Sequence, residues 1–322
     1  DMKAFFAFAS LLFVAAVAVS QSSVEEYRFF TVPQADDYEG KVVSTFIAHK
    51  SNEHRSKAVL YLHGYNDYFF QYQMGDSVIA HGMDFYAVEL RKYGRSKLEN
   101  QTWFEVKDLS EYYADIDSAI ARIKAEGTKD IYFLAHSTGG LIASLYLNDR
   151  QEERSIKAAV FNSPFLDFNL SGIVRNGLIP TLAFFRPVAG KVKISQGKSR
   201  VYANSLLKDH EGEWEFDTLM KFPVSPSVSI NWLSAIKRGH RKVKKGLNIA
   251  CPVLVLSSDA SNGDAATTDR VLNYKHIMKR ADKLGNSICK RTIHHGKHDL
   301  ALSIKPARDE FYRQMFDFIA AH

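Results

Sequence analysis

Ser137 is the residue of this 322-residue chain that is best placed to act as a nucleophile. It lies in Ala135-His136-Ser137-Thr138-Gly139, between a short apolar run rich in β-forming residues and a helical pattern. A serine on such a sharp strand-to-helix turn is exposed above the sheet edge, and small residues are needed two places before and after it. Ala135 and Gly139 meet that need, with alanine in the first glycine place of a G-x-S-x-G pattern. Because short patterns arise by chance, a plain helix cap is the alternative role for Ser137, and the rest of the chain must decide.

A serine hydroxyl near neutral pH needs a base, and that base needs an acid that orients it. In sites built on this kind of turn the order along the chain is serine, acid, histidine. The last expected strand is followed by His294-His295-Gly296-Lys297-His298. We select His298 because it lies past the strand end in a glycine-containing loop, whereas His294 and His295 belong to the strand or its first turn. His136 is expected to point away from the site, because neighbours on a sharp turn diverge.

The acid is predicted to be Asp269, in the long loop after the strand that ends at Ser257. Asp269 stands immediately before a helical pattern and 298 − 269 = 29 residues before His298, which leaves room for one helix, one strand and two loops. Asp259, at 298 − 259 = 39 residues before the histidine, is the alternative acid, and Asp264 is a third choice. Whichever serves would fix the tautomer of the histidine and stabilise the imidazolium that forms.

A tetrahedral intermediate of acyl transfer also needs two aligned hydrogen-bond donors. One is expected to be the backbone N–H of Thr138, directly after the serine. The second is expected from the loop His63-Gly64-Tyr65, with the Tyr65 N–H as donor. Gly64 would let the backbone approach the oxyanion. The alternative for this loop is a plain turn at a strand end.

The elements that must position these residues alternate between strand and helix. Strands are expected at residues 27–32, 42–49, 58–62, 85–90, 131–135, 156–162, 252–257 and 287–293. Helices are expected at 69–81, from 108–111 to about 126 (with Ser110 as the cap), and at 138–149, 271–284 and 306–321. Residues 33–40 are expected to form a turn. Continuous apolar strands alternating with helices predict an α/β fold with a mainly parallel sheet covered on both faces.

The alternation fails between residues 165 and 248. This block mixes aromatic, proline and basic residues, and it is interpreted as a lid inserted over the carboxyl ends of the strands, where open α/β sheets bind ligands. The expected organisation is therefore a core in two parts, 21–164 and 249–322, separated by the lid at 165–248.

The N-terminus has the pattern of a secretory signal peptide at residues 1–20. Lys3 precedes an apolar run, and Ala18-Val19-Ser20 supplies small residues for cleavage. An uncleaved anchor is the alternative. The mature chain is expected to be extracellular or luminal, and the sequons at Asn100 and Asn169 agree with that route and predict a glycoprotein. Cys251 and Cys289 either pair in the oxidising compartment or remain free thiols.

The charge excess is modest and local. The chain carries 42 Lys and Arg against 36 Asp and Glu, a formal charge of +6, and a basic run lies at residues 237–245. We favour a solvated helix face for that run over a patch that attracts anionic lipid. The chain has no zinc-ligand spacing and no basic–aromatic alternation that would indicate nucleic acid binding. The serine chemistry implies neither a metal nor an organic cofactor.

Together these motifs resemble the α/β-hydrolases, and within them the monoglyceride lipase and lysophospholipase group, also described as serine aminopeptidase-like. The resemblance is carried by His63–Tyr65, Glu89–Ser96, Ala135–Gly139, Asn162–Asp167 and Gly296–Asp299. The chain departs from the group at Ala135, where glycine is usual, and at Glu89, where aspartate is usual. The lid also differs from that of monoglyceride lipases.

The resemblance implies a serine hydrolase that cleaves carboxylic esters of lipid-like type, such as monoacylglycerols or lysophospholipids, through an acyl-enzyme. The aromatic lid favours an apolar acyl chain, because each buried methylene contributes ~0.8 kcal/mol, and the basic residues near it favour transient contact with a lipid interface. Peptide or amide hydrolysis is the alternative, with Glu211, Glu213 and Glu215 as a clamp for an amino terminus. A non-catalytic binding protein that has kept the fold is a further alternative.

Overall fold

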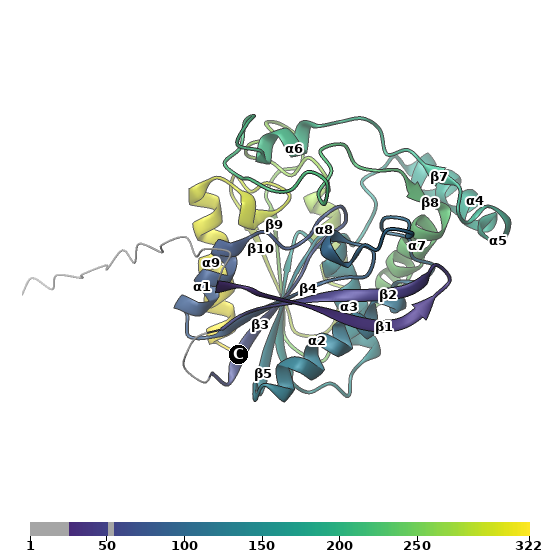
Figure 1. The fold of residues 1–322 in the computed structure, drawn as a ribbon. Helices are drawn as coiled ribbons and strands as arrows, with labels where there is room; N and C mark the ends of the chain where they lie inside the picture. The colour runs from purple at the N-terminus through teal and green to yellow at the C-terminus, as the bar shows by residue number, and fades with distance from the viewer. Residues whose placement is uncertain (1–25, 51–54) are drawn as a thin grey trace, which may run out of the picture.

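A sheet of eight strands organises the computed structural model, which describes residues 26–50 and 55–322 (Figure 1). The order across the sheet is β1-β2-β4-β3-β5-β6-β9-β10. The pairs β1–β2 and β2–β4 are antiparallel, and all the other neighbours are parallel. The strands are β1 (Arg28–Asp37), β2 (Gly40–His49), β3 (Lys57–Leu62), β4 (Asp84–Glu89), β5 (Asp130–His136), β6 (Ile156–Asn162), β9 (Val253–Ser258) and β10 (Ile288–Ile293). The signal peptide predicted at 1–20 lies outside the described residues.

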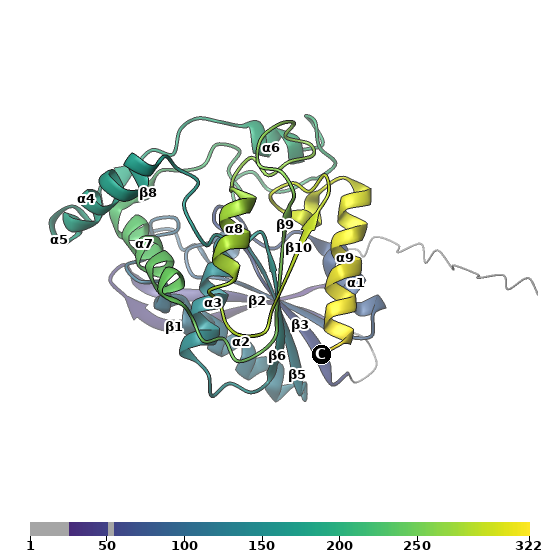
Figure 2. The same cartoon turned by 180° about the vertical axis from the view of Figure 1, so that it is seen from behind.

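Helices cover both faces of the sheet (Figures 1 and 2). They are α1 (Tyr72–Ala80), α2 (Tyr113–Ala125), α3 (Thr138–Asp149), α8 (Tyr274–Ala281) and α9 (Lys305–Ala320). α1 and α9 share a buried apolar cluster on one face, and α2, α3 and α8 share another on the opposite face. The α/β fold with a mainly parallel, doubly covered sheet is thereby confirmed. Within the described ranges, every helix is too short or too polar to cross a bilayer.

The N-terminal hairpin is longer than the sequence predicts. We expected a turn at 33–40, but β1 runs through Pro33 to Asp37, where it pairs with Gly40 of β2. The register shifts between Gln34 and Asp37. Because β1 is an edge strand, it tolerates a proline that would break the ladder of a central strand.

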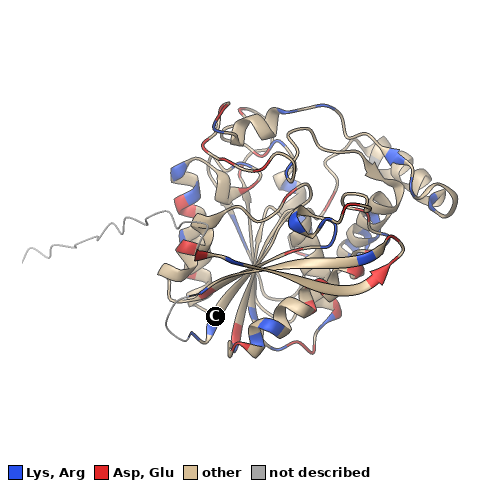
Figure 3. Ribbon diagram, in the orientation of Figure 1, with Lys and Arg blue, Asp and Glu red and all other residues tan. Residues whose placement is uncertain are grey.

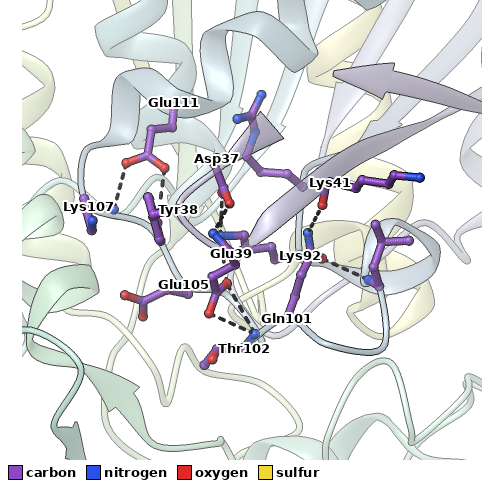
Figure 4. Close-up of polar contacts among 12 residues, drawn as sticks. Asp37, Tyr38, Glu39, Lys41, Lys92, Gln101, Thr102, Glu105, Lys107 and Glu111 are labelled. Atoms are coloured by element: carbon purple, nitrogen blue, oxygen red, sulfur yellow. Dashed lines mark hydrogen bonds and ion pairs between the residues drawn. The ribbon is translucent and has the colours of Figure 1, made fainter. Parts of the chain in front are cut away.

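The tip of this hairpin is tied to the core by a buried lysine (Figure 4). The Nζ of Lys92 lies 2.6 Å from Oδ2 of Asp37 and 2.8 Å from Oε2 of Glu39, and Lys92 is fully buried. The Tyr38 ring lies 4.4 Å from the same ammonium, and its hydroxyl donates to Oε2 of Glu111 over 3.2 Å. The loop after β4 is therefore held against the hairpin by charge.

The start of α2 differs from the prediction in its capping residue. Asp108 is the N-cap, not Ser110: its Oδ1 accepts the backbone N–H of Ser110, and the side chain of Glu111 accepts the backbone N–H of Asp108. This is a capping box, which satisfies two of the free donors at a helix start. It opens a 3₁₀ turn, η3 (Leu109–Tyr112), that leads into α2.

The insertion at 165–248 is more regular than predicted. It contains a π-helical turn, η4 (Val174–Leu178), followed by α4 (Ile179–Phe184), α5 (Arg186–Ala189), β7 (Lys193–Ile194), α6 (Val201–Leu206), β8 (Val228–Ser229) and α7 (Ile230–Lys245). α7 packs against α3 and buries Trp232, Ile236 and Val243 in the core. The insertion therefore ends in a helix that belongs to the body of the protein.

The basic run at 237–245 places several of its lysines and arginines on the exposed face of α7, whereas His240 and Val243 are buried. Arg241, Lys242, Lys244 and Lys245 are exposed, and Lys242 lies 3.2 Å from a carboxylate oxygen of Asp149. These side chains lie on an exposed helix face, and Asp149 of α3 balances part of their charge. Whether the face attracts anionic lipid stays a prediction.

Both cysteines are free thiols. Cys251 packs on the face of the sheet that carries α2 and α3, whereas Cys289 packs on the face that carries α1 and α9. Of the two alternatives left open by the sequence, the structure therefore has the unpaired one.

Candidate active site

Ser137 lies on the turn between β5 and α3, in a backbone conformation that few residues adopt. Its φ is 52° and its ψ is −117°, and such strain persists only where the surrounding structure enforces it. A Cβ on Gly139 would lie 2.4 Å from the carbonyl oxygen of His63, and one on Gly140 would lie 2.7 Å from Pro164 Cβ. The small residues after the serine are thus required by the close approach of neighbouring chain segments.

Three side chains from separate loops meet at this turn. Oγ of Ser137 lies 2.9 Å from Nε2 of His298, and Nδ1 of His298 lies 3.0 Å from Oδ2 of Asp269. All three are buried, with Ser137 retaining 8% of its accessible surface. A proton on Nδ1 donates to the carboxylate, which leaves Nε2 free to accept the serine proton.

Asp269, and neither of the other two candidates, contacts the histidine of this site. Its Oδ1 accepts the backbone N–H groups of Val271 and Leu272, both over 2.8 Å, so the carboxylate is oriented before it meets the imidazole. Asp259 instead lies 2.7 Å from Nδ1 of the exposed His294. Asp264 is exposed and accepts a backbone N–H within its own turn.

The loop His63-Gly64-Tyr65 lies directly against the serine. A Cβ on Gly64 would lie 3.0 Å from Cβ of Ser137. Nε2 of His63 accepts the backbone N–H of Leu90 over 3.1 Å, and burial lowers the pKa of His63 to about 4. His63 is therefore a neutral structural residue that fixes the loop. The Tyr65 hydroxyl donates to the carbonyl of Pro226 in the insertion, over 3.0 Å.

Thr138 is the first residue of α3. The N–H groups of the first helical turn have no partner within the helix, and the helix dipole favours negative charge there. The backbone around Ser137 thus offers a donor on the α3 side, with the Tyr65 loop on the other side.

A family model described as "Serine aminopeptidase, S33" matches residues 53–303 of the chain. The chain belongs to the serine aminopeptidase S33 family. It is accordingly a serine hydrolase, as the serine on its sharp strand-to-helix turn and the resemblance to serine aminopeptidase-like proteins predicted. No curated protein matches the chain in sequence.

Solved structures share the fold of this S33 member at low sequence identity. A soluble variant of monoglyceride lipase from Saccharomyces cerevisiae, in complex with a substrate analog, has a TM-score of 0.67 at 13% identity and covers 91% of this chain and 97% of its own. Monoacylglycerol lipase from Paleococcus ferrophilus has a TM-score of 0.64 at 16% identity, covering 92% and 99%. A carboxyl esterase from Bacillus coagulans, in complex with glycerol, has a TM-score of 0.66 at 14% identity, covering 91% and 98%. These likenesses establish the α/β-hydrolase fold.

Glu89, the departure from the related group noted in the sequence, holds the loop after β4. It is fully buried, accepts the backbone N–H of Phe69 and of Arg95, and pairs with the Arg95 guanidinium. Burial raises the pKa of Glu89 even though Arg95 opposes that shift. A Cβ on Gly94 would lie 2.6 Å from Oε2 of Glu89, so the longer acid and the glycine fit together.

The prediction that His136 points away from the site is wrong. Its ring centroid lies 4.9 Å from that of His298. Nδ1 of His136 lies 3.5 Å from Oδ2 of Asp67 and 3.9 Å from Oδ2 of Asp299. Lys221, from the insertion, lies 2.8 Å from the other oxygen of Asp67. We call Asp67, His136, Lys221 and Asp299 the buried ion cluster.

Sequence reasoning missed this cluster because its members come from four distant segments. The only signal was the density of titratable residues beside the site motifs: Asp67 follows the His63 loop, His136 precedes the serine and Asp299 follows His298. The ligand atoms of these three lie within 4.8 Å of one another, a spacing that a metal ion could bridge, as do those of Glu26, His49 and Asp76 elsewhere. In the buried ion cluster, however, the Lys221 ammonium is already paired with the Asp67 carboxylate and supplies a positive charge there.

Part of the insertion is fastened over the site by buried polar contacts. We call residues 202–226 the cap strap. The Tyr202 hydroxyl accepts the backbone N–H of Asp299 over 3.2 Å, and the indole N–H of Trp214 donates to the carbonyl of Leu302 over 2.9 Å. The Tyr202 ring lies 5.7 Å from the His298 ring. The strap is therefore a wall of the site.

Proposed function

We propose that this chain hydrolyses carboxylic esters with Ser137 as nucleophile, His298 as general base and acid, and Asp269 as the acid that orients the histidine. The observation that supports this most directly is the pair of contacts of 2.9 and 3.0 Å that join the three side chains through one imidazole. Geometry of this kind is what serine acyl transfer needs.

The proposed reaction proceeds in two halves. Ser137 attacks the acyl carbonyl while His298 accepts its proton, and the N–H groups of Tyr65 and Thr138 stabilise the oxyanion, each by ~2.7–4 kcal/mol. His298 then protonates the leaving alcohol, which leaves an acyl-enzyme on Ser137. The same histidine activates a water molecule, which releases the acid and restores the serine.

A lipid-like ester is the substrate class that we propose, because of the exposed half of the insertion. We call residues 168–201 the cap arm; it contains six Lys or Arg and no Asp or Glu (Figure 3). Large apolar side chains are exposed along it: Leu170, Ile173, Leu178, Phe184, Phe185, Val188, Val192 and Val201. An apolar surface with basic residues and no acidic ones suits transient contact with an anionic lipid interface.

Amide hydrolysis is the second candidate, favoured by the match to a family described as serine aminopeptidase. It would need acidic residues that bind the amino terminus of a substrate, and Glu211, Glu213 and Glu215 are the candidates in the cap strap. All three are exposed, Glu213 pairs with Arg308 and Glu215 pairs with Lys208. Because two of the three acids already have cationic partners, we favour the ester.

A substrate panel separates these functions. Purified protein is given p-nitrophenyl esters of increasing acyl length, monoacylglycerol and lysophospholipid, in parallel with aminoacyl anilides. The proposal predicts ester turnover that rises with acyl length, lost in Ser137→Ala. Turnover of anilides with inert esters would overturn it in favour of a peptidase, and binding of esters without turnover would indicate a non-catalytic binding protein.

We also propose that the protein is secreted and glycosylated. This rests on the N-terminal pattern and on the exposure of Asn100 and Asn169, the acceptors of both sequons. Expression in a eukaryotic secretory host tests it: the medium should contain a chain that begins near residue 21 and whose mobility changes after glycosidase treatment. Retention in the cell with residues 1–20 intact would contradict it.

A further inference from the structure

The buried ion cluster lies beside the histidine of the proposed triad and has no assigned role in the reaction. Asp67 and Asp299 are completely inaccessible, and His136 and Lys221 retain less than a tenth of their surface. Burying charges is costly unless they are paired. The protonation state of His136 therefore determines the net charge of the cluster next to His298.

Both carboxylates of the cluster face hydrogen-bond donors or a cation. Oδ1 of Asp299 accepts Nδ2 of Asn162 over 2.7 Å and the backbone N–H of Ala301 over 3.0 Å, and its Oδ2 accepts Nε2 of Gln71 over 3.3 Å. Oδ1 of Asp67 accepts the Lys221 ammonium over 2.8 Å. These three oxygens thus accept from donors. The fourth, Oδ2 of Asp67, makes no hydrogen bond and lies 3.5 Å from Nδ1 of His136. Although burial opposes it, the Lys221 ammonium holds the pKa of Asp67 well below its usual range.

His136 Nδ1 carries a proton, because the carboxylate oxygens of Asp67 and Asp299 lie 3.5 and 3.9 Å from it and would repel a lone pair there. Two carboxylates against one ammonium leave one uncompensated negative charge in a buried site. A second proton on the His136 ring makes the cluster neutral. Neither ring nitrogen makes a hydrogen bond to a described residue, so the ring interacts with its surroundings mainly through charge.

We propose that His136 is held as an imidazolium in the buried ion cluster, and that its positive charge makes His298 less basic. His136 is in this sense a positioning residue, because it acts on the reaction through His298. This role of His136 in the reaction rests on the proposed ester hydrolysis, whereas the positive charge of its ring does not.

The surroundings of His136 are consistent with a bound proton. Burial lowers the pKa of His136, but Asp299 and Asp67 outweigh burial, and the net shift is upward. The charged and titratable groups that face it come from the loop after β3 (His63, Asp67), from the cap strap (Lys221) and from the loop after β10 (His298, Asp299). Of these, Lys221 opposes the proton and the two carboxylates favour it.

The kinetic test compares pH profiles of kcat/KM for a soluble p-nitrophenyl ester. In His136→Gln the imidazolium is lost, and the acid limb, which reports the free-enzyme pKa of His298, should move to higher pH by about one unit. His81→Gln, at an exposed histidine that ends α1, is the matched control and should leave the limb in place. An unmoved limb in active His136→Gln would show that His136 is neutral and overturn the proposal.

A spectroscopic test needs no variant and no activity. The ¹⁵N shifts of the wild-type histidine side chains, recorded at pH 7, distinguish an imidazolium from either neutral tautomer. His136 should show the imidazolium pattern, whereas His63 and His240, whose pKa values burial lowers to about 4, should be neutral in the same spectrum. A neutral His136 would overturn the proposal even if the protein hydrolyses esters. An imidazolium in a protein that turns over no ester would instead count against the proposed function alone.

Discussion

The carboxylate of Asp259 lies 2.7 Å from Nδ1 of His294, on the surface and outside the site. A contact of the same kind joins Asp269 to His298, but His294 is exposed, and it is His298 that lies 2.9 Å from Oγ of Ser137. Asp259 is thus paired with His294, and Asp269 is the carboxylate that orients His298, the histidine next to Ser137.

Substitution of the two acids tests that assignment. Asp269→Asn should lower kcat by about 10⁴-fold, because an amide stabilises the wrong imidazole tautomer and cannot balance the imidazolium. Asp259→Asn should keep nearly full activity. Both are measured with the same soluble ester, and circular dichroism verifies folding. Full activity in Asp269→Asn together with loss in Asp259→Asn would reverse the assignment.

Gly64→Ala tests the position of the Tyr65 loop. The added Cβ would lie 3.0 Å from Ser137 Cβ and 3.1 Å from His136 Nδ1, so the loop has to move away from the serine. A displaced oxyanion donor should lower kcat by about 10²-fold, with little change in KM. Gly177→Ala, where an added Cβ meets nothing within 4 Å, is the control. If both variants keep wild-type kcat, the loop does not supply a donor.

The cap arm should bind anionic lipid. Phe184→Ser with Val188→Ser replaces two of its most exposed apolar side chains and should weaken co-sedimentation with phosphatidylglycerol vesicles, while turnover of a soluble ester stays unchanged. Leu219→Ser, equally apolar and exposed but outside the arm, is the matched control. Stronger binding to zwitterionic than to anionic vesicles, or equal binding by all three proteins, would contradict a lipid-facing arm.

Lys92 should be important for stability and not for chemistry. Lys92→Met would leave the carboxylates of Asp37 and Glu39 without the cation that they share (Figure 4). Removing one partner of a buried ion pair costs about 3–5 kcal/mol of the free energy of unfolding, which urea denaturation measures. Lys41→Met, exposed on the same hairpin, should change it little. Equal stability of the two variants would show that the pairing of Lys92 contributes nothing net.

The parts of the site that lie close to strand ends could be predicted from the sequence. The small residues around Ser137 are required by a sharp turn, and the loop after the last strand restricted the histidine to a short segment. The helix that starts just after Asp269 favoured this residue over the other two candidate acids. These predictions succeeded in placing residues near one another because parallel strands deliver their carboxyl ends to one edge of the sheet.

What the sequence could not predict depends on contacts between distant segments. The position of His136 follows from Asp67 and Asp299, whose carboxylates both lie near its Nδ1, and Lys221 reaches the cluster from the insertion. β1 continues through Pro33 because it is an edge strand, a fact of sheet order that local composition does not contain. The cap at the start of η3 was also beyond the sequence. Aspartate and serine both favour helix starts, so the sequence pointed to Ser110 where the structure has Asp108.

Covalent labelling tests most directly whether Ser137 is a nucleophile activated by His298. The wild-type protein is treated with a fluorophosphonate and the adduct is located by peptide mass spectrometry. We predict one adduct per chain, on the peptide that contains Ser137, with no adduct in Ser137→Ala and far slower labelling in His298→Gln. An adduct on another residue, or equal labelling of Ser137→Ala, would contradict the account.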